Sequence, residues 1–123
     1  MKCPFENFYS RFEEVCDTPE WARLQEDFNQ SDYVYVVGNG GNMAIASHAA
    51  ADVTRLTGKK TFCLDSQSLL TSFANDFGYE NIFARWLEFY AVDTDKKSLV
   101  LGYSGSGNSK NVLGALDWAH NQH

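Results

Sequence analysis

Two short segments rich in glycine, serine and asparagine have the composition of anion-binding turns. The first is GNGGN at residues 38–42, and the second is SGSGNS at residues 104–109. Glycine lets the backbone approach a ligand closely, while free amides at a helix N-terminus and serine hydroxyls favour a bound anion. Each segment alone is also an ordinary tight turn, but the pair predicts a site for a phosphate-type group that needs no lysine.

Four other polar residues are candidates for chemistry or binding. His48 and Asp52 are four residues apart, so they share one face of a helix. Asp52 has the chemistry of a general base, and the pair would be half of a metal site, which needs a third and usually a fourth ligand. The same spacing also fits an ordinary His–Asp contact at the surface, and from spacing alone this second interpretation is favoured. Asn75 and Asp76 either end a helix or contribute polar contacts, and the pattern leaves both open.

The elements that position these residues follow from apolar periodicity. Strands are predicted at 33–37, 61–64 and 98–103, and helices at about 5–16, 19–28, 43–56, 66–74, 82–90 and 112–119. The first strand does not alternate with polar residues, so both of its faces should be buried. Strands that alternate with helices predict a three-layer α/β fold with a doubly wound parallel sheet of order 2-1-3, preceded by N-terminal helices. In that order strands one and three are neighbours, so the two glycine-rich turns should face each other at the switch point.

Composition excludes several classes of protein. The chain has 123 residues, 44% of them hydrophobic, which suits one globular domain. A net charge of -6 argues against nucleic-acid binding through phosphate neutralisation, and no apolar run approaches the ~20 residues that a membrane span needs. Cys3, Cys16 and Cys63 are odd in number and widely spaced, as in reduced thiols, so a cytoplasmic location is expected.

A dinucleotide site is the main alternative that the local pattern offers. Residues 38–43 begin like G-x-G-x-x-G, and Asp65 follows the second predicted strand, where a ribose-binding acid would stand. Met43 occupies the third glycine position, however, where it would obstruct close packing of helix and strand. The serine-rich segment also has no role in that scheme. A Walker A loop is excluded because the chain has no Gly-Lys-Ser or Gly-Lys-Thr.

From about Tyr33 to Trp118 the chain resembles sugar isomerase (SIS) domains, and among these the phosphoheptose isomerases. The resemblance lies in residues 38–41 with His48 and Asp52, in residues 74–85 (ANDFGYENIFAR) and in residues 104–112 (SGSGNSKNV). It implies a single domain over 1–123, with N-terminal helices at 1–31 and a phosphosugar-binding core at 32–123.

The resemblance also implies roles for individual residues. His48 and Asp52 would help to bind zinc and would act in catalysis, with Asp52 as the catalytic carboxylate. The reaction would be an aldose–ketose rearrangement of sedoheptulose 7-phosphate, or a related sugar phosphate, through an enediol. The residues expected to bind the phosphorylated sugar are Asn39, Gly40, Gly41, Asn42, Asn75, Asp76, Ser104, Gly105, Ser106 and Ser109.

The chain departs from the family pattern at several points. The family has Glu where this chain has Asp52, Ser where it has Asn42, and Thr where it has Gly105. The family also continues with two strands and a C-terminal helix that supplies a Gln and a His, so the C-terminal strands of the fold are expected to be absent here.

The third strand would then lie at a sheet edge, where its unpaired amides require cover. This edge would be covered in one of three ways: by a partner subunit, by a C-terminal part from another chain, or by the same strand of a second copy. The expected assembly is a homo-oligomer, either a dimer or a tetramer, formed through the N-terminal helices and this edge. The alternative to an enzyme is a non-catalytic module that binds phosphosugars or another protein.

Overall fold

The computed structural model describes residues 5–91 and 95–122 and divides the chain into two compact units after Gln30. Cys3 lies outside the described residues. The first unit consists of α1 (Phe8–Cys16) and α2 (Pro19–Gln30). At the start of α2, the Thr18 hydroxyl accepts a hydrogen bond from the Trp21 amide at 3.2 Å. This capping bond explains why a new helix begins at Pro19, as the Thr-Pro sequence predicts.

The second unit is built on a parallel sheet of β1 (Tyr33–Gly38), β2 (Lys60–Cys63) and β3 (Ser98–Tyr103). The strand order is β2-β1-β3, which confirms the predicted α/β topology. Gly38 at the end of β1 lies opposite Tyr103 at the end of β3. The carboxyl ends of these two strands are therefore side by side.

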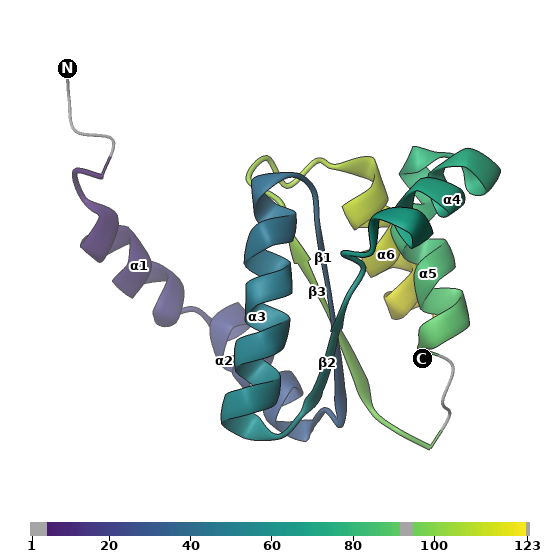
Figure 1. The fold of residues 1–123 in the computed structure, drawn as a ribbon. Helices are drawn as coiled ribbons and strands as arrows, with labels where there is room; N and C mark the ends of the chain where they lie inside the picture. Colours follow the sequence, from purple (N-terminus) through teal and green to yellow (C-terminus); the bar gives the residue numbers. More distant parts are fainter. Residues whose placement is uncertain (1–4, 92–94, 123) are drawn as a thin grey trace. The chain divides into compact units, whose positions relative to one another are not determined.

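Helices cover both faces of this sheet (Figure 1), with α3 on one side and α4, α5 and α6 on the other. Their bounds are α3 (Gly41–Thr57), α4 (Gln67–Phe77), the 3-10 turn η1 (Tyr79–Asn81), α5 (Ile82–Tyr90) and α6 (Lys110–His120). The predicted helix at 43–56 begins earlier, at Gly41, so the first glycine-rich segment includes the first turn of α3. The second strand lies one residue earlier than predicted.

The core lies mainly between β1 and the α4–α6 layer. Tyr35 and Val37 point into it, whereas Val34 and Val36 point to the face that α3 covers, because side chains alternate along a strand. All four are at most 2% exposed, so the central strand is buried on both faces as predicted. The other buried residues of this core are Leu64, Phe73, Ile82, Phe83, Trp86, Leu87, Val112 and Ala115.

A close contact between β3 and α6 depends on Gly102. A Cβ atom built on Gly102 would lie 2.6 Å from Cγ1 of Val112, well inside van der Waals contact. Any other residue at this position would push α6 away from the sheet. Gly102 thus sets how closely the start of α6, and the serine-rich loop before it, approach the end of β3.

Candidate functional site

The two glycine-rich turns lie next to each other at the carboxyl edge of the sheet. One follows β1 and the other follows β3, and the two strands are paired up to Gly38 and Tyr103. Side chains also join the two segments, because Asn39 is hydrogen-bonded to Asn111 in the first turn of α6. The structure therefore has the crevice between strand ends that a doubly wound sheet uses for ligands.

The first turn is closed by its own backbone. Gly40 has φ 55° and ψ −122°, a conformation that favours glycine. The carbonyl of Asn39 accepts from the Asn42 amide at 3.0 Å, and the carbonyl of Gly40 accepts from the Met43 amide at 3.0 Å. No acceptor in the described part of the chain lies against the amides of Gly40 and Gly41. These two donors at the start of α3 are available to an anion.

In the second turn, hydrogen bonds hold the serine hydroxyls in place. The Ser104 hydroxyl accepts from the Gly107 amide at 3.1 Å and lies 3.2 Å from the Ser109 hydroxyl. The Ser106 hydroxyl accepts from the Asn108 amide at 3.2 Å. The loop backbone therefore orients Ser104 and Ser106. Both can still donate a proton to an oxygen of a ligand, because a hydroxyl is at once donor and acceptor.

The start of α6 adds backbone donors to the same place. Ser109 precedes the helix but makes no side-chain capping bond. The Val112 amide instead donates a hydrogen bond to Oδ1 of Asn111 at 3.0 Å. The amides of Lys110 and Asn111 have no partner within the helix, and the helix dipole makes this end positive. Ser104, Ser106, Ser109 and the first turn of α6 thus form one polar surface suited to a phosphate group.

A cleft of about 540 Å³ adjoins this surface. Its lining residues are Asn39, Gly78, Tyr79, Glu80, Ser109, Lys110 and Asn111. Of the predicted site residues, only Asn39 and Ser109 line it. The ammonium of Lys110 and the carboxylate of Glu80 are 3.9 Å apart, with both side chains largely exposed.

Sequence reasoning missed Tyr79 and Asn111 as individual site residues. Asn111 is only 3% exposed, and its one signal in the sequence was its position two residues after the serine-rich turn. Tyr79 had a weaker signal, its position just after Asn75 and Asp76.

Asn75 and Asp76 lie in the last turn of α4, which ends at Phe77, and both are exposed. Their side chains bond to each other, with Nδ2 of Asn75 donating to Oδ1 of Asp76 at 2.9 Å. Gly78 and Tyr79, which line the cleft, follow directly. Asn75 and Asp76 therefore stand just before the cleft-lining segment but outside the lining itself.

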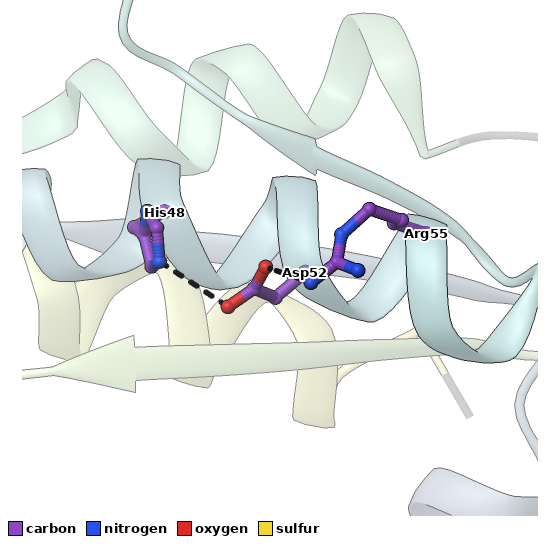
Figure 2. Close-up of polar contacts among 3 residues, drawn as sticks. All are labelled: His48, Asp52 and Arg55. Atoms are coloured by element: carbon purple, nitrogen blue, oxygen red, sulfur yellow. Dashed lines mark hydrogen bonds and ion pairs between the residues drawn. The ribbon is translucent and has the colours of Figure 1, made fainter.

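His48 and Asp52 share one face of α3, as their spacing predicts. Figure 2 shows Nε2 of His48 pointing at Asp52, 3.2 Å from Oδ2, while Arg55 donates to Oδ1 of Asp52 at 3.1 Å. The side chains of His48 and Asp52 are 80% and 40% exposed. The three side chains form a polar cluster at the surface of α3, and neither His48 nor Asp52 lines the cleft.

Zinc was expected to bind at His48 and Asp52. These two residues offer one imidazole nitrogen and one carboxylate, whereas a zinc site takes at least three protein ligands. Within residues 5–91 and 95–122 no three His, Cys, Asp or Glu side chains are grouped so as to hold a metal. The described residues alone do not fit a complete zinc site.

Asp65, two residues after Cys63, lies where the dinucleotide alternative would place its ribose-binding acid. Oδ2 of Asp65 accepts from the Ser47 hydroxyl on α3 at 2.5 Å. Burial, and secondarily the negative charge of Asp65, raises the pKa of the Cys63 thiol to about 11. Cys16 and Cys63 are both free thiols.

The fold and the paired turns define a doubly wound α/β domain whose switch point has a crevice flanked by backbone amides and serine hydroxyls. No family model matches the chain. By sequence the chain is similar to phosphoheptose isomerases over most of its own length, which confirms the resemblance. It is 40% identical over 102 residues to the phosphoheptose isomerase of Helicobacter pylori strain Shi470, covering 78% of this chain and 52% of the relative. It is 39% identical over 105 residues to that of Pelobacter propionicus, covering 80% of this chain and 53% of the relative.

A solved structure gives the same result. Phosphoheptose isomerase GmhA from Neisseria gonorrhoeae superposes with a TM-score of 0.78 at 28% identity, covering 94% of this chain and 64% of that chain. The chain thus spans about half the length of the curated relatives that it matches. Among the helices that the structure describes, none has the length and apolar character required to cross a bilayer.

Proposed function

We propose that this chain binds a phosphorylated sugar between its two glycine-rich turns and acts as a phosphoheptose-isomerase-like aldose–ketose isomerase. The observation that carries this proposal is the pairing of Gly38 with Tyr103, because it puts the donors of both turns at one edge of the sheet. The kinship with phosphoheptose isomerases supports sedoheptulose 7-phosphate, or a related sugar phosphate, as the substrate.

The phosphate would bind at the serine-rich turn. Hydroxyls of Ser104, Ser106 and Ser109 and the free amides of the first turn of α6 would donate to its oxygens, with Gly105 leaving room for the backbone to approach. Gly40 and Gly41 would add amides from the start of α3. The sugar hydroxyls would be held by Asn39, which lines the cleft. Asn42, Asn75 and Asp76, which lie outside the lining, would add further polar contacts.

The chemical step would use Asp52 and His48. The carboxylate of Asp52 would remove a proton from the carbon beside the carbonyl, giving an enediol, and the proton would return to the neighbouring carbon. His48, 3.2 Å from Asp52, would move the hydroxyl proton between the two oxygens of the enediol. Proton removal and return balance, so the reaction needs no oxidant and no reductant.

We further propose that His48 and Asp52 supply two ligands of a zinc site. Two ligands are half of a tetrahedral set, so the remaining ligands would come from outside the described residues. Zinc bound there would act as a Lewis acid on the substrate oxygens.

The enzyme proposal is tested by following the conversion of sedoheptulose 7-phosphate with and without added zinc. Asp52→Asn should abolish turnover, while the exposed carboxylate of Asp117 on α6 offers a matched control in Asp117→Asn. If the folded wild-type protein binds the sugar but shows no turnover, the proposed catalysis is rejected and the proposed sugar binding is kept.

A non-catalytic binding module is the second candidate. It is favoured by the 80% exposure of His48 and by the engagement of Asp52 with Arg55. Phosphosugars should then raise the melting temperature without turnover, and the double variant Ser104→Ala with Ser106→Ala should lose that shift. A shift that persists in the double variant would contradict the assigned phosphate site.

We also propose a cytoplasmic homo-oligomer, a dimer or a tetramer, formed through the N-terminal helices and the outer edge of β3. In the first unit, large apolar side chains are more than half exposed, and these are Phe5, Phe8, Tyr9, Phe12 and Val15. Within the described residues no strand pairs with β3 on its outer side. Light scattering should give a multiple of 13.9 kDa, and Phe8→Ser with Phe12→Ser should lower it. A wild-type monomer would contradict this assembly.

A further inference from the structure

Three side chains from distant parts of the chain form one hydrogen-bonded network beside the cleft. Nδ2 of Asn39 donates to Oδ1 of Asn111 at 2.8 Å, and Nδ2 of Asn111 donates back to Oδ1 of Asn39 at 2.9 Å. The hydroxyl of Tyr79 donates to the same Oδ1 of Asn39 at 2.8 Å. The network joins the β1 turn, the start of α6 and η1, and all three residues line the cleft.

The reciprocal pair does not by itself decide which end of each amide is oxygen. If both amides turned over together, each nitrogen would again face an oxygen, so two orientations would be equivalent. The Val112 amide removes this ambiguity, because it lies 3.0 Å from Oδ1 of Asn111 and can only donate. Asn111 is therefore held with its oxygen toward Val112, and the pairing transmits this orientation to Asn39.

The result is a fixed donor at the turn after β1. Oδ1 of Asn39 accepts two hydrogen bonds, which fills its capacity. Nδ2 of Asn39 uses one of its two N–H groups on Asn111. Within the described part of the chain no acceptor meets the other N–H, so Asn39 keeps a donor for a ligand oxygen.

We propose that Asn111 and Tyr79 are positioning residues that orient the Asn39 amide so that its second N–H is presented to an oxygen of the bound phosphosugar. This inference rests on the proposed function for its ligand, but the network itself is tested without a ligand. Asn111 orients Asn39 through the paired amides, and Tyr79 holds the oxygen end in place. Their contribution to affinity passes entirely through Asn39.

The ligand-free test is hydrogen exchange of the side-chain NH₂ groups measured by NMR. Exchange of the Asn39 group should be at least about tenfold slower than that of Asn121, which follows α6 and is exposed. Asn111→Ala removes the oxygen that accepts from Nδ2 of Asn39, so this protection should disappear. Asn39 exchange as fast as that of Asn121 in the wild type would overturn the network.

The binding test compares dissociation constants for sedoheptulose 7-phosphate. Tyr79→Phe removes one hydroxyl from a side chain that is 55% exposed, so it keeps the fold. It should weaken binding about two- to tenfold, the range that one hydrogen bond contributes. Tyr90→Phe removes a hydroxyl from another half-exposed tyrosine and should change nothing. Asn111→Asp should weaken binding more than Tyr79→Phe. It should also lower the melting temperature, because a buried carboxylate replaces a neutral amide, so its affinity is measured well below that temperature.

A double-mutant cycle separates positioning from a direct or merely structural role. In an Asn39→Ala background, Tyr79→Phe should cause no further loss of affinity. A loss that persists there, or unchanged affinity in both Tyr79→Phe and Asn111→Asp, would overturn the inference while the proposed function stands. A wild-type chain that protects Asn39 but binds no sugar phosphate would overturn the proposed function and the ligand assigned here, leaving only the network.

Discussion

The contact between Gly102 and Val112 allows a quantitative test that links the fold to the site. Gly102→Ala adds a Cβ 2.6 Å from Cγ1 of Val112, where carbon atoms normally rest about 3.5–4.0 Å apart. Restoring normal contact requires a displacement of about 1 Å between α6 and β3. Overpacking of this kind costs about 1–3 kcal/mol of unfolding free energy.

The same displacement should weaken phosphosugar binding, because α6 carries the first-turn amides and follows Ser109. Urea unfolding measures the change in unfolding free energy, and the ligand-induced rise in melting temperature measures the change in phosphosugar binding. Val112→Ala removes the clashing atom, so the double variant should be less destabilised than the sum of the two single variants, by about 1–2 kcal/mol. Strictly additive costs would refute the claim that these two residues set the spacing of α6.

Three further predictions concern single positions. Gly41→Ala adds a Cβ with no neighbour within 4 Å, so the stability measured by urea unfolding should stay the same or rise. Phosphosugar affinity measured by calorimetry should fall, and an unchanged affinity would show that Gly41 is not part of the site. The side chain of Gly105→Thr also meets open space, and it reduces the backbone freedom of the unfolded chain, so the free energy of unfolding should rise by about 0.4–1 kcal/mol. The added hydroxyl should tighten phosphosugar binding, and a lower melting temperature would contradict the prediction. The pKa of Cys63 is about 11 instead of 9.0, so at pH 8 its thiolate is about 100-fold scarcer than that of an unshifted thiol. Peptide mass analysis should therefore show slow alkylation by iodoacetamide, which becomes about tenfold faster per pH unit and also speeds up on unfolding. Rapid alkylation of the folded chain at pH 8 would contradict the burial.

The sheet and the juxtaposition of the two turns were predictable because they follow from one pattern. The apolar run at 33–37 lacks alternation, so it had to be central, and parallel connections then bring its end beside that of 98–103. The start of α3 at Gly41 was not predictable from propensity, since glycine is a poor helix former and usually marks a loop.

The Asn39–Asn111 pair was beyond sequence reasoning for a different reason. It joins residues 72 positions apart through side-chain orientations that depend on packing. The exposed His48–Asp52 contact was foreseen as one of two interpretations, and its geometry matches that of a surface pair.

The position of His48 and Asp52 along α3 has a consequence for the size of any molecule turned over here. An α-helix rises about 1.5 Å per residue, so His48 lies about 10 Å, and Asp52 about 16 Å, along the axis from Gly41. Under the proposed function, the phosphate at the serine-rich turn would also meet the amides of Gly40 and Gly41 at the start of α3, with the carboxylate of Asp52 further along the helix. An extended carbon chain would then be needed to span that distance, whereas a compact three-carbon phosphate bound at the same place would not reach the carboxylate and would act as an inhibitor.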